Sequence, residues 1–234
     1  MVIKKIGIIG AMDEEVNKTI KIMTNYNKTI YASMSFYDGE IDNRDVVVVR
    51  SGIGKVNAAI CTQILIDLFK VDAIINTGIA GSLKNEINIG DMVISTDSIQ
   101  HDVDASKFGY DPGVIPRMGT STFLAEEYLI NKTYDVCKKF LPHLSTFKGR
   151  VLSGDQFIAE NSKKEWLANT FNGYCTEMEG AAIGQVANLN DIPYVIIRSI
   201  SDKADNSAQM TYEEFEEQAI NNTFILIQEL IKAI

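Results

Sequence analysis

The chain has 234 residues, of which 46% are hydrophobic and 23% charged, and its formal net charge is −9. These proportions are ordinary for a globular protein, and the length is sufficient for one large hydrophobic core. The acidic balance argues against nucleic acid or an anionic membrane surface as a partner, because both require a basic face. It leaves a small anionic ligand possible, since local dipoles can outweigh net charge.

The chain is predicted to form a single domain over residues 1–234. It has only four prolines and shows no linker-like tract or internal repeat. Three scattered cysteines, Cys61, Cys137 and Cys175, form no CxxC motif, so we expect reduced thiols in a cytoplasmic protein. The apolar N-terminal run is too short for a signal sequence, and no stretch is long enough to span a membrane.

Apolar β-branched runs alternate with segments of helical periodicity along the chain. Strands are expected at 3–10, 29–36, 46–51, 73–77, 92–99, 150–153 and 194–199. Helices are expected at 13–23, 56–69, 124–140, 163–170, 179–190 and 212–234. This order predicts βαβ units, a largely parallel sheet and helices on both of its faces, with ligands bound outside the carboxyl ends of the strands.

Two segments carry more specific expectations. The helix at 56–69 is expected to turn Ala59, Ile60, Ile64 and Leu68 toward the core. The stretch at 101–122 contains several glycines and prolines and no periodic pattern, and a loop of that length is usually functional or part of an interface.

Several familiar motifs fail on inspection. "GIIGAMDE" lacks the third glycine of a dinucleotide fingerprint and places Asp13 and Glu14 where a pyrophosphate would lie. "SGIGKVNAA" has Val56 where a P-loop needs serine or threonine. "HDVD", starting at His101, has no second histidine or cysteine nearby, so a loop or interface role is preferred over a metal site.

Carboxylate chemistry remains. Glu15 follows the first strand, Glu177 and Glu179 precede an Ala/Gly-rich helix, and Asp202 follows the apolar run of "VIIRSISD". A buried carboxylate is costly unless it is paired, and Arg198 is an obvious partner for Glu179. A structural ion pair and a catalytic set of acids both fit these residue types.

The motifs together resemble one family. "IGIIGAMDEEV", "SGIGKVNAA", "INTGIAGS", "SGDQFI", "EMEGAAIGQVA" and "VIIRSISDKAD" occur in the order and spacing of bacterial 5′-methylthioadenosine/S-adenosylhomocysteine nucleosidases. These enzymes belong to the purine nucleoside phosphorylase and nucleosidase superfamily. The resemblance implies a single-domain, three-layer α/β/α fold with a mixed, twisted central sheet, a homodimer, no metal and no cofactor.

The resemblance also implies hydrolysis of an adenine–ribose bond. Asp202, with Ser201 beside it, would protonate adenine N7, and Glu15 would activate the attacking water. Glu179 would bind the ribose hydroxyls, and Arg198 would hold Glu179 and the water. The remaining matches are Met178 and Glu177 around the sugar, Phe157 and Ile158 at adenine, Met12 and Ile53 at the 5′ group, and Phe108, Tyr110 and Pro116 reaching the neighbouring subunit's pocket.

Two departures bear on specificity. Ile79 stands where the family usually has serine in "TGSAG", so we leave Ile79 out of the predicted site, although its neighbouring backbone could still serve. Gly180 and Ala181 in "MEGAA" replace the commoner "MEATA" and occur in relatives that act on other nucleosides.

Three alternatives stay open at this point. A phosphorolytic purine nucleoside phosphorylase would need cationic donors for phosphate, and the turns near the acids carry no arginine besides Arg198. An aminofutalosine nucleosidase is poorly separated by sequence. A catalytically silent nucleoside-binding protein would not need an acid at the purine edge.

Overall fold

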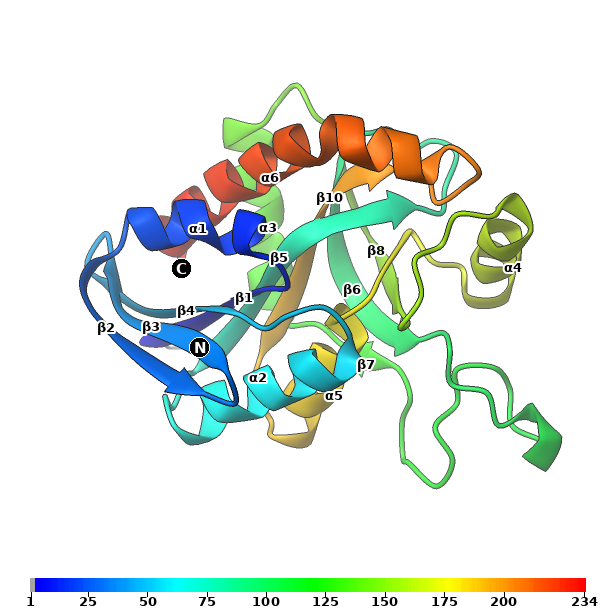
Figure 1. Cartoon of the computed structure of the whole chain (residues 1–234), viewed down its shortest axis with the longest axis horizontal. Coiled ribbons are helices and arrows are strands. Elements are labelled where there is room, and N and C mark those ends of the chain that lie inside the picture. The colour runs from blue at the N-terminus through cyan, green and yellow to red at the C-terminus, as the bar shows by residue number, and fades with distance from the viewer. Residues whose placement is uncertain (1–2) are drawn as a thin grey trace.

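The computed structural model describes residues 3–234, except the side chains at 209 and 210. One sheet is covered by helices on both faces, which confirms the predicted α/β architecture (Figure 1). Its strands are β1 (Lys5–Gly10), β2 (Thr24–Tyr31), β3 (Met34–Ile41), β4 (Arg44–Arg50), β5 (Ala73–Ser82), β6 (Met92–Gln100), β7 (Phe123–Leu124), β8 (Thr146–Ser153), β9 (Cys175–Glu177) and β10 (Tyr194–Asp202). The helices are α1 (Asp13–Lys21), α2 (Lys55–Asp67), α3 (Glu127–Phe140), α4 (Asn161–Phe171), α5 (Gly180–Leu189) and α6 (Ala208–Ala233), with a short 3-10 turn, η1, at Ser106–Phe108.

The sheet is mixed rather than largely parallel. Its order is β10-β6-β8-β9-β5-β1-β4-β3-β2, and β10 also pairs with β5, so part of the sheet closes on itself. In the centre of the sheet, three pairs of strands are parallel, namely β1 with β4, β1 with β5 and β5 with β10. The pairing of β6 with β10 is antiparallel. The expectation of a largely parallel sheet was wrong because hairpins, which periodicity does not reveal, join β2 to β3 and β3 to β4.

The core is split by the sheet into two apolar layers. Ile6 and Ile8 of β1 face the layer that contains helix α6, whereas Ile9 faces the layer beneath α2 and α5. Val195 and Ile196 of β10 divide in the same way. This alternation is what a strand buried on both faces requires, and it explains the near-continuous apolar runs of the sequence.

The predicted strand at 29–36 is in fact a hairpin. β2 ends at Tyr31 and β3 begins at Met34, with Ala32 and Ser33 both at positive φ between them. Such two-residue turns favour glycine and asparagine, so the Ala-Ser pair gives little warning of the reversal.

The inward face of α2 also differs from the prediction. Ala58, Cys61 and Leu65 are buried, whereas Ile60 and Leu68 are exposed. The helix is apolar almost all round, so periodicity alone could not select its buried face.

Short elements account for most other differences. β9 has three residues and β7 two, below the length that a pattern can resolve. α3 begins at Glu127 rather than 124, because Phe123 and Leu124 pair with β6. β5 continues through "GIAGS" to Ser82 instead of ending at Thr77, since β10 stays paired with it.

Within residues 3–234, no helix is long and apolar enough to cross a membrane.

The parallel strands in the centre of the sheet determine where the site can form. Gly10 ends β1, and Gly81 and Asp202 lie opposite each other near the ends of β5 and β10. These carboxyl ends meet at one edge, beside the N-terminus of α1 and the first turns of α6. Polar side chains delivered there face one another across a common space.

Candidate active site

A cavity of about 250 Å³ lies at this edge. It is lined by Ala11, Met12, Glu15, Ile53, Ile79, Ala80, Gly81, Phe157, Thr176, Glu177, Met178, Glu179, Ser201, Asp202 and Tyr212. Its walls are mostly apolar, and its polar groups are concentrated in four carboxylates and two hydroxyl-bearing strand residues. A concave, apolar space with a few convergent polar groups is the usual form of a small-molecule site.

Glu15 is held by backbone amides. It occupies the third position of α1, where its Oε2 accepts hydrogen bonds from the N–H groups of Ala11 (2.6 Å) and Met12 (3.0 Å). The Ile79 N–H lies 3.3 Å from Oε1. Burial raises the pKa of Glu15, against the lowering effects of the Arg198 charge and these three N–H groups. The carboxylate is therefore fixed in direction, and its burial makes it a stronger base than an exposed glutamate.

Asp202 lies at the end of β10 with a different set of partners. Its Oδ1 accepts from the Ala204 N–H at 2.7 Å, and its Oδ2 accepts from the Ser201 hydroxyl at 2.9 Å. Burial raises the pKa of this carboxyl and outweighs the two hydrogen bonds that lower it. No basic side chain lies within ion-pairing distance of Asp202 among the described residues. The arrangement suits a carboxylic acid that donates its proton.

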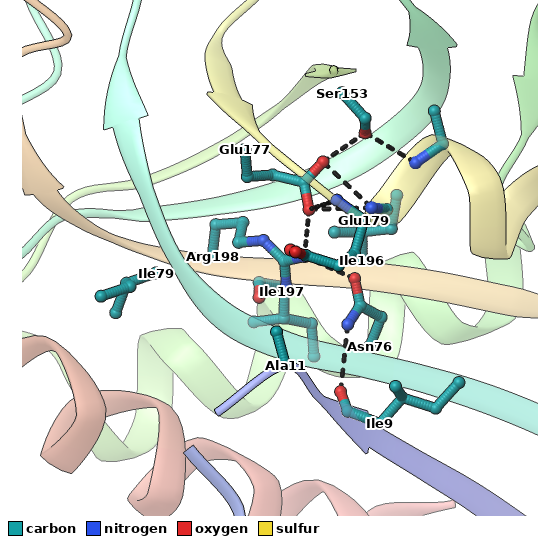
Figure 2. A network of polar contacts seen from close by, with 12 residues as sticks. Ile9, Ala11, Asn76, Ile79, Ser153, Glu177, Glu179, Ile196, Ile197 and Arg198 are labelled. Carbon is teal, nitrogen blue, oxygen red and sulfur yellow. Dashed lines mark hydrogen bonds and ion pairs between the residues drawn. The ribbon is translucent and has the colours of Figure 1, made fainter. Parts of the chain in front are cut away.

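Arg198 pairs with Glu177, not with Glu179 as predicted. Its Nη2 donates to Glu177 Oε2, and Figure 2 shows the two side chains meeting. Glu177 also accepts from the Ser153 hydroxyl and from the N–H groups of Glu179 and Gly180. The prediction failed because the two glutamates are two residues apart in the sequence, and only the β9-to-α5 turn decides which one faces the arginine.

Glu179 is left with a backbone donor only. Its Oε1 accepts from the Gly54 N–H at 2.8 Å. Burial and the nearby Glu177 charge raise the pKa of Glu179 to about 8, although Gly54 and Arg198 oppose the shift. A carboxyl of this kind carries a proton at neutral pH and loses it to solvent when a positive charge is placed beside it, because that charge lowers its pKa.

Two glycines of β5 allow the acids to approach the sheet. A Cβ at Gly78 would lie 2.6 Å from Glu15 Oε1 and 3.2 Å from Arg198 Nη1. A Cβ at Gly81 would lie 2.6 Å from Asp202 Oδ1. The "TGIAG" segment thus provides the space in which the acids lie, which is a reason for its glycines that the sequence alone did not supply.

Most of the residues predicted for the site do converge. Nine of them line the cavity: Met12, Glu15, Ile53, Phe157, Glu177, Met178, Glu179, Ser201 and Asp202. Ile158 lines a smaller adjoining space, and Arg198 lies buried behind Glu177. Phe108, Tyr110 and Pro116 do not line this chain's cavity; Phe108 is 84% exposed in the segment between β6 and β7, which extends away from the body of the molecule (Figure 1).

Sequence reasoning missed several lining residues. Ile79, which we left out of the site, lines the cavity and packs against Met12 and Tyr212. Tyr212, in the first turns of α6, also contacts the Phe157 ring edge-on at a centroid distance of 6.0 Å. It lay in a segment whose acidic run is typical of a solvated helix face, so nothing in its local sequence marked it.

The "HDVD" segment follows β6 and contacts the start of α2. Asp102 forms an ion pair with Lys55 at 2.6 Å, and His101 is buried in the turn after β6. Burial lowers the pKa of His101 to about 4, so the ring is neutral. Among residues 3–234, no group of three or more His, Cys, Asp or Glu side chains is placed to hold a metal ion.

A partly open cavity with separately held carboxyl groups of raised pKa defines a site for acid–base chemistry on a small, largely apolar molecule. A model of the phosphorylase superfamily matches residues 5–232, and the chain belongs to that superfamily.

The chain is similar to nucleosidases of that superfamily. It is 42% identical over 228 residues to the 5′-methylthioadenosine/S-adenosylhomocysteine nucleosidase of Halalkalibacterium halodurans, with 97% of each chain covered. Its structure matches the Neisseria meningitidis nucleosidase in complex with methylthio-immucillin-A with a TM-score of 0.94, at 34% identity over 99% of this chain and all of that one. The futalosine hydrolase of Helicobacter pylori also matches, with a TM-score of 0.94 and 31% identity over 99% of this chain and 98% of the other.

Proposed function

We propose that the protein hydrolyses the N-glycosidic bond of 5′-methylthioadenosine and S-adenosylhomocysteine, and of 5′-deoxyadenosine, to adenine and the 5-substituted ribose. The observation that carries this proposal is the placement of Glu15 and Asp202 around one cavity, each buried, held by hydrogen bonds and with a raised pKa. The relatives with nucleosidase names support the same substrates.

Asp202 acts as the general acid. Its carboxyl proton passes to N7 of adenine while the bond between the sugar C1′ and adenine N9 breaks, and the bonding electrons leave with the base. A neutral adenine then departs. The Ala204 N–H and the Ser201 hydroxyl stabilise the carboxylate that Asp202 becomes, and Phe157 and Ile158 border the space that the purine occupies.

Glu15 acts as the general base. It accepts a proton from water as the water oxygen forms its bond to C1′, so that the products are adenine and a sugar with a free hydroxyl. The three N–H groups hold the Glu15 carboxylate in a fixed direction at the cavity wall and leave one lone pair on Oε1 to take the proton, and the Arg198 charge limits how far its pKa rises.

Glu179 binds the ribose and stabilises its developing charge. Bond cleavage of this kind develops positive charge on the ribose ring, and a nearby carboxylate stabilises that charge. Glu179 also lies in position to accept hydrogen bonds from the ribose hydroxyls. Met12, Ile53 and Ile79 form an apolar wall that suits a thioether at the 5′ position.

Water is favoured over phosphate as the nucleophile. No lysine or arginine is among the residues that line the cavity, and its charged lining groups are all carboxylates. A phosphate dianion would be repelled there, since phosphate sites rely on arginine, lysine or helix N-termini free of acids. The likeness to futalosine hydrolase makes 6-amino-6-deoxyfutalosine a second candidate substrate.

Adenine release from methylthioadenosine, adenosylhomocysteine, 5′-deoxyadenosine and aminofutalosine, measured side by side with and without phosphate, tests the proposed function. We expect release from the thioether nucleosides at the same rate in both buffers, because no phosphate-binding group lines the cavity. Strict dependence on phosphate would show a phosphorylase, and release from aminofutalosine alone would select the second candidate.

Asp202→Asn removes the proton donor while keeping the shape of the side chain. We expect turnover of methylthioadenosine to fall about 100-fold or more, the range of general-acid contributions. Binding of a substrate-like inhibitor should stay within about tenfold, because the amide still fits the same space. Asp205→Asn, which alters a half-buried acid three residues away that does not line the cavity, is the matched control. Unchanged turnover in Asp202→Asn would remove Asp202 from this role.

We further propose that the chain functions as a homodimer in which the segment 101–122 reaches the neighbouring pocket. The face formed by α2, β7 and α5 exposes large apolar side chains, among them Val56, Leu124 and Leu189. Exposed apolar patches of this kind are typical of interaction surfaces. Ile53, which lines the cavity, lies at the edge of the same face, so a partner there would stand beside the site.

Val56→Asp tests this surface, because Val56 is 70% exposed and its replacement costs little in a monomer. We expect sedimentation to show a dimer for the unmodified chain and a shift toward monomer for the variant, with a loss of activity. Ile30→Asp, on the exposed strand β2, is the control and should change neither. A fully active monomer at micromolar concentration would contradict the proposal.

A cytoplasmic location and a part in methionine salvage belong to the same proposal. Cys61, Cys137 and Cys175 are free and buried, as suits a reducing compartment. The proposed substrates are by-products of reactions that use the sulfonium form of methionine, and cleaving them returns adenine and the sulfur-bearing sugar for reuse.

A further inference from the structure

Asn76 is a buried amide at the centre of the sheet. It lies on β5 opposite Ile9 of β1 and Ile196 of β10, and it is 1% exposed. Its neighbours along β5, Ile74 and Ile75, are fully buried and apolar. An amide at such a position is costly unless its donors and acceptor find partners.

Both sides of the amide have a partner, and the partners fix its orientation. Nδ2 donates to the Ile9 carbonyl at 3.0 Å, and Oδ1 accepts from Arg198 Nη2 at 2.5 Å (Figure 2). The carbonyl can only accept and the guanidinium can only donate, so the amide has one possible direction. Asn76 therefore links the backbone of β1 to the arginine on β10.

The guanidinium that Asn76 holds lies between two site carboxylates. Nη2 is shared by Asn76 and Glu177, while Nη1 donates to the Ile197 carbonyl at 3.1 Å. Arg198 Nη1 and Glu15 Oε1 both lie close to the point where a Cβ at Gly78 would stand, at 3.2 Å and 2.6 Å, so the two side chains share the space that this glycine leaves. The direction of the guanidinium thus determines how strongly its charge acts on Glu177 and how strongly it acts on Glu15.

Resting on the hydrolysis proposed above, we propose that Asn76 is a positioning residue for the reaction, which holds the Arg198 guanidinium between Glu177 and the water-activating Glu15. It touches neither the substrate nor the cavity and acts only through the arginine. Aspartate could not replace it, because a carboxylate would meet the Ile9 carbonyl with a second acceptor and would compete with Glu177 for Arg198.

Asn76→Leu is the principal test, because leucine has a similar volume and no polar atom. With Arg198 less constrained, its charge acts less on Glu15, so Glu15 takes up a proton at higher pH. We expect kcat for methylthioadenosine to fall about tenfold or more, in the general-base range, with KM changed less than threefold. The acid limb of kcat/KM should move to higher pH, because that limb reports the base of the free enzyme.

Two further variants make the result decisive. Asn76→Ser keeps a hydroxyl that can donate to Ile9 and leaves room for water, so it should retain more activity than Asn76→Leu. Asn222→Leu removes a buried amide on α6 that makes a long, 3.5 Å hydrogen bond to the Gly90 carbonyl, and it should leave both kcat and the acid limb unchanged.

Each outcome decides a separate question. If the unmodified chain releases no adenine, the proposed function fails and not this inference. If it does, and Asn76→Leu folds with unchanged kcat and an unmoved acid limb, Asn76 is structural only and the inference is overturned. Failure of both Asn76 variants to fold, judged by circular dichroism, would equally assign the residue to the fold and overturn it.

Discussion

Arg198 is one buried cation among three buried carboxylates, Glu15, Glu177 and Glu179, and the rest of the site depends on this imbalance of charge. Arg198 is 1% exposed and satisfies Glu177 directly. A guanidinium in the core is costly without such a partner, and breaking the pair would leave an uncompensated charge. Because Glu177 takes the arginine, Glu15 and Glu179 are held chiefly by N–H groups. Burial raises the pKa of both carboxyls, the Glu177 charge adds to the shift of Glu179, and the Arg198 charge opposes the shift of each.

The imbalance has a chemical use. Where buried carboxyl groups outnumber cations, a carboxyl can keep its proton at neutral pH in the free protein, as the raised pKa of Glu179 indicates. A sugar that becomes positive during bond cleavage can take the place of such a proton, so that the same excess of acid stabilises the transition state more than the ground state. The neighbourhood of Asp202 lacks the arginine altogether, which keeps its role as a proton donor distinct from that of the acids around the sugar.

The fold supplies the precision. Parallel strands β1, β5 and β10 end at one edge, and the glycines of "TGIAG" remove the side chains that would otherwise occupy the space of Glu15 and Asp202. The turn before α2 contributes the Gly54 N–H, with Gly54 at φ +97°, a conformation that glycine adopts without strain. Backbone groups therefore do much of the work of orientation, and they cannot drift as flexible side chains can.

The sequence predicted a large part of this, and the failures have physical causes. The β-branched runs identified the central strands because burial on both faces demands them, and the motif resemblance located the acids. Contacts between distant segments were harder to predict from the sequence. The Arg198–Glu177 pair depends on a turn of two residues, and the hairpin at Ala32 and Ser33 depends on positive φ angles that these residue types rarely adopt. Asn76 and Tyr212 were overlooked for a related reason, since each matters through a neighbour distant in the sequence. Ile79 was left out because it lacks the family's hydroxyl, and it lines the cavity with an apolar side chain instead.

Glu179 holds a proton in the free protein and releases it when a positively charged sugar binds. Calorimetric titration at pH 7, in buffers with different heats of ionisation, measures this with a 5′-methylthio adenosine analogue whose sugar carries a protonated amine. We predict release of close to one proton per site by the unmodified chain, less as the pH rises through about 8, where Glu179 is already ionised. Glu179→Gln should release close to one proton fewer per site. Equal proton release by the two proteins, or none by the unmodified chain at pH 7, would contradict the account.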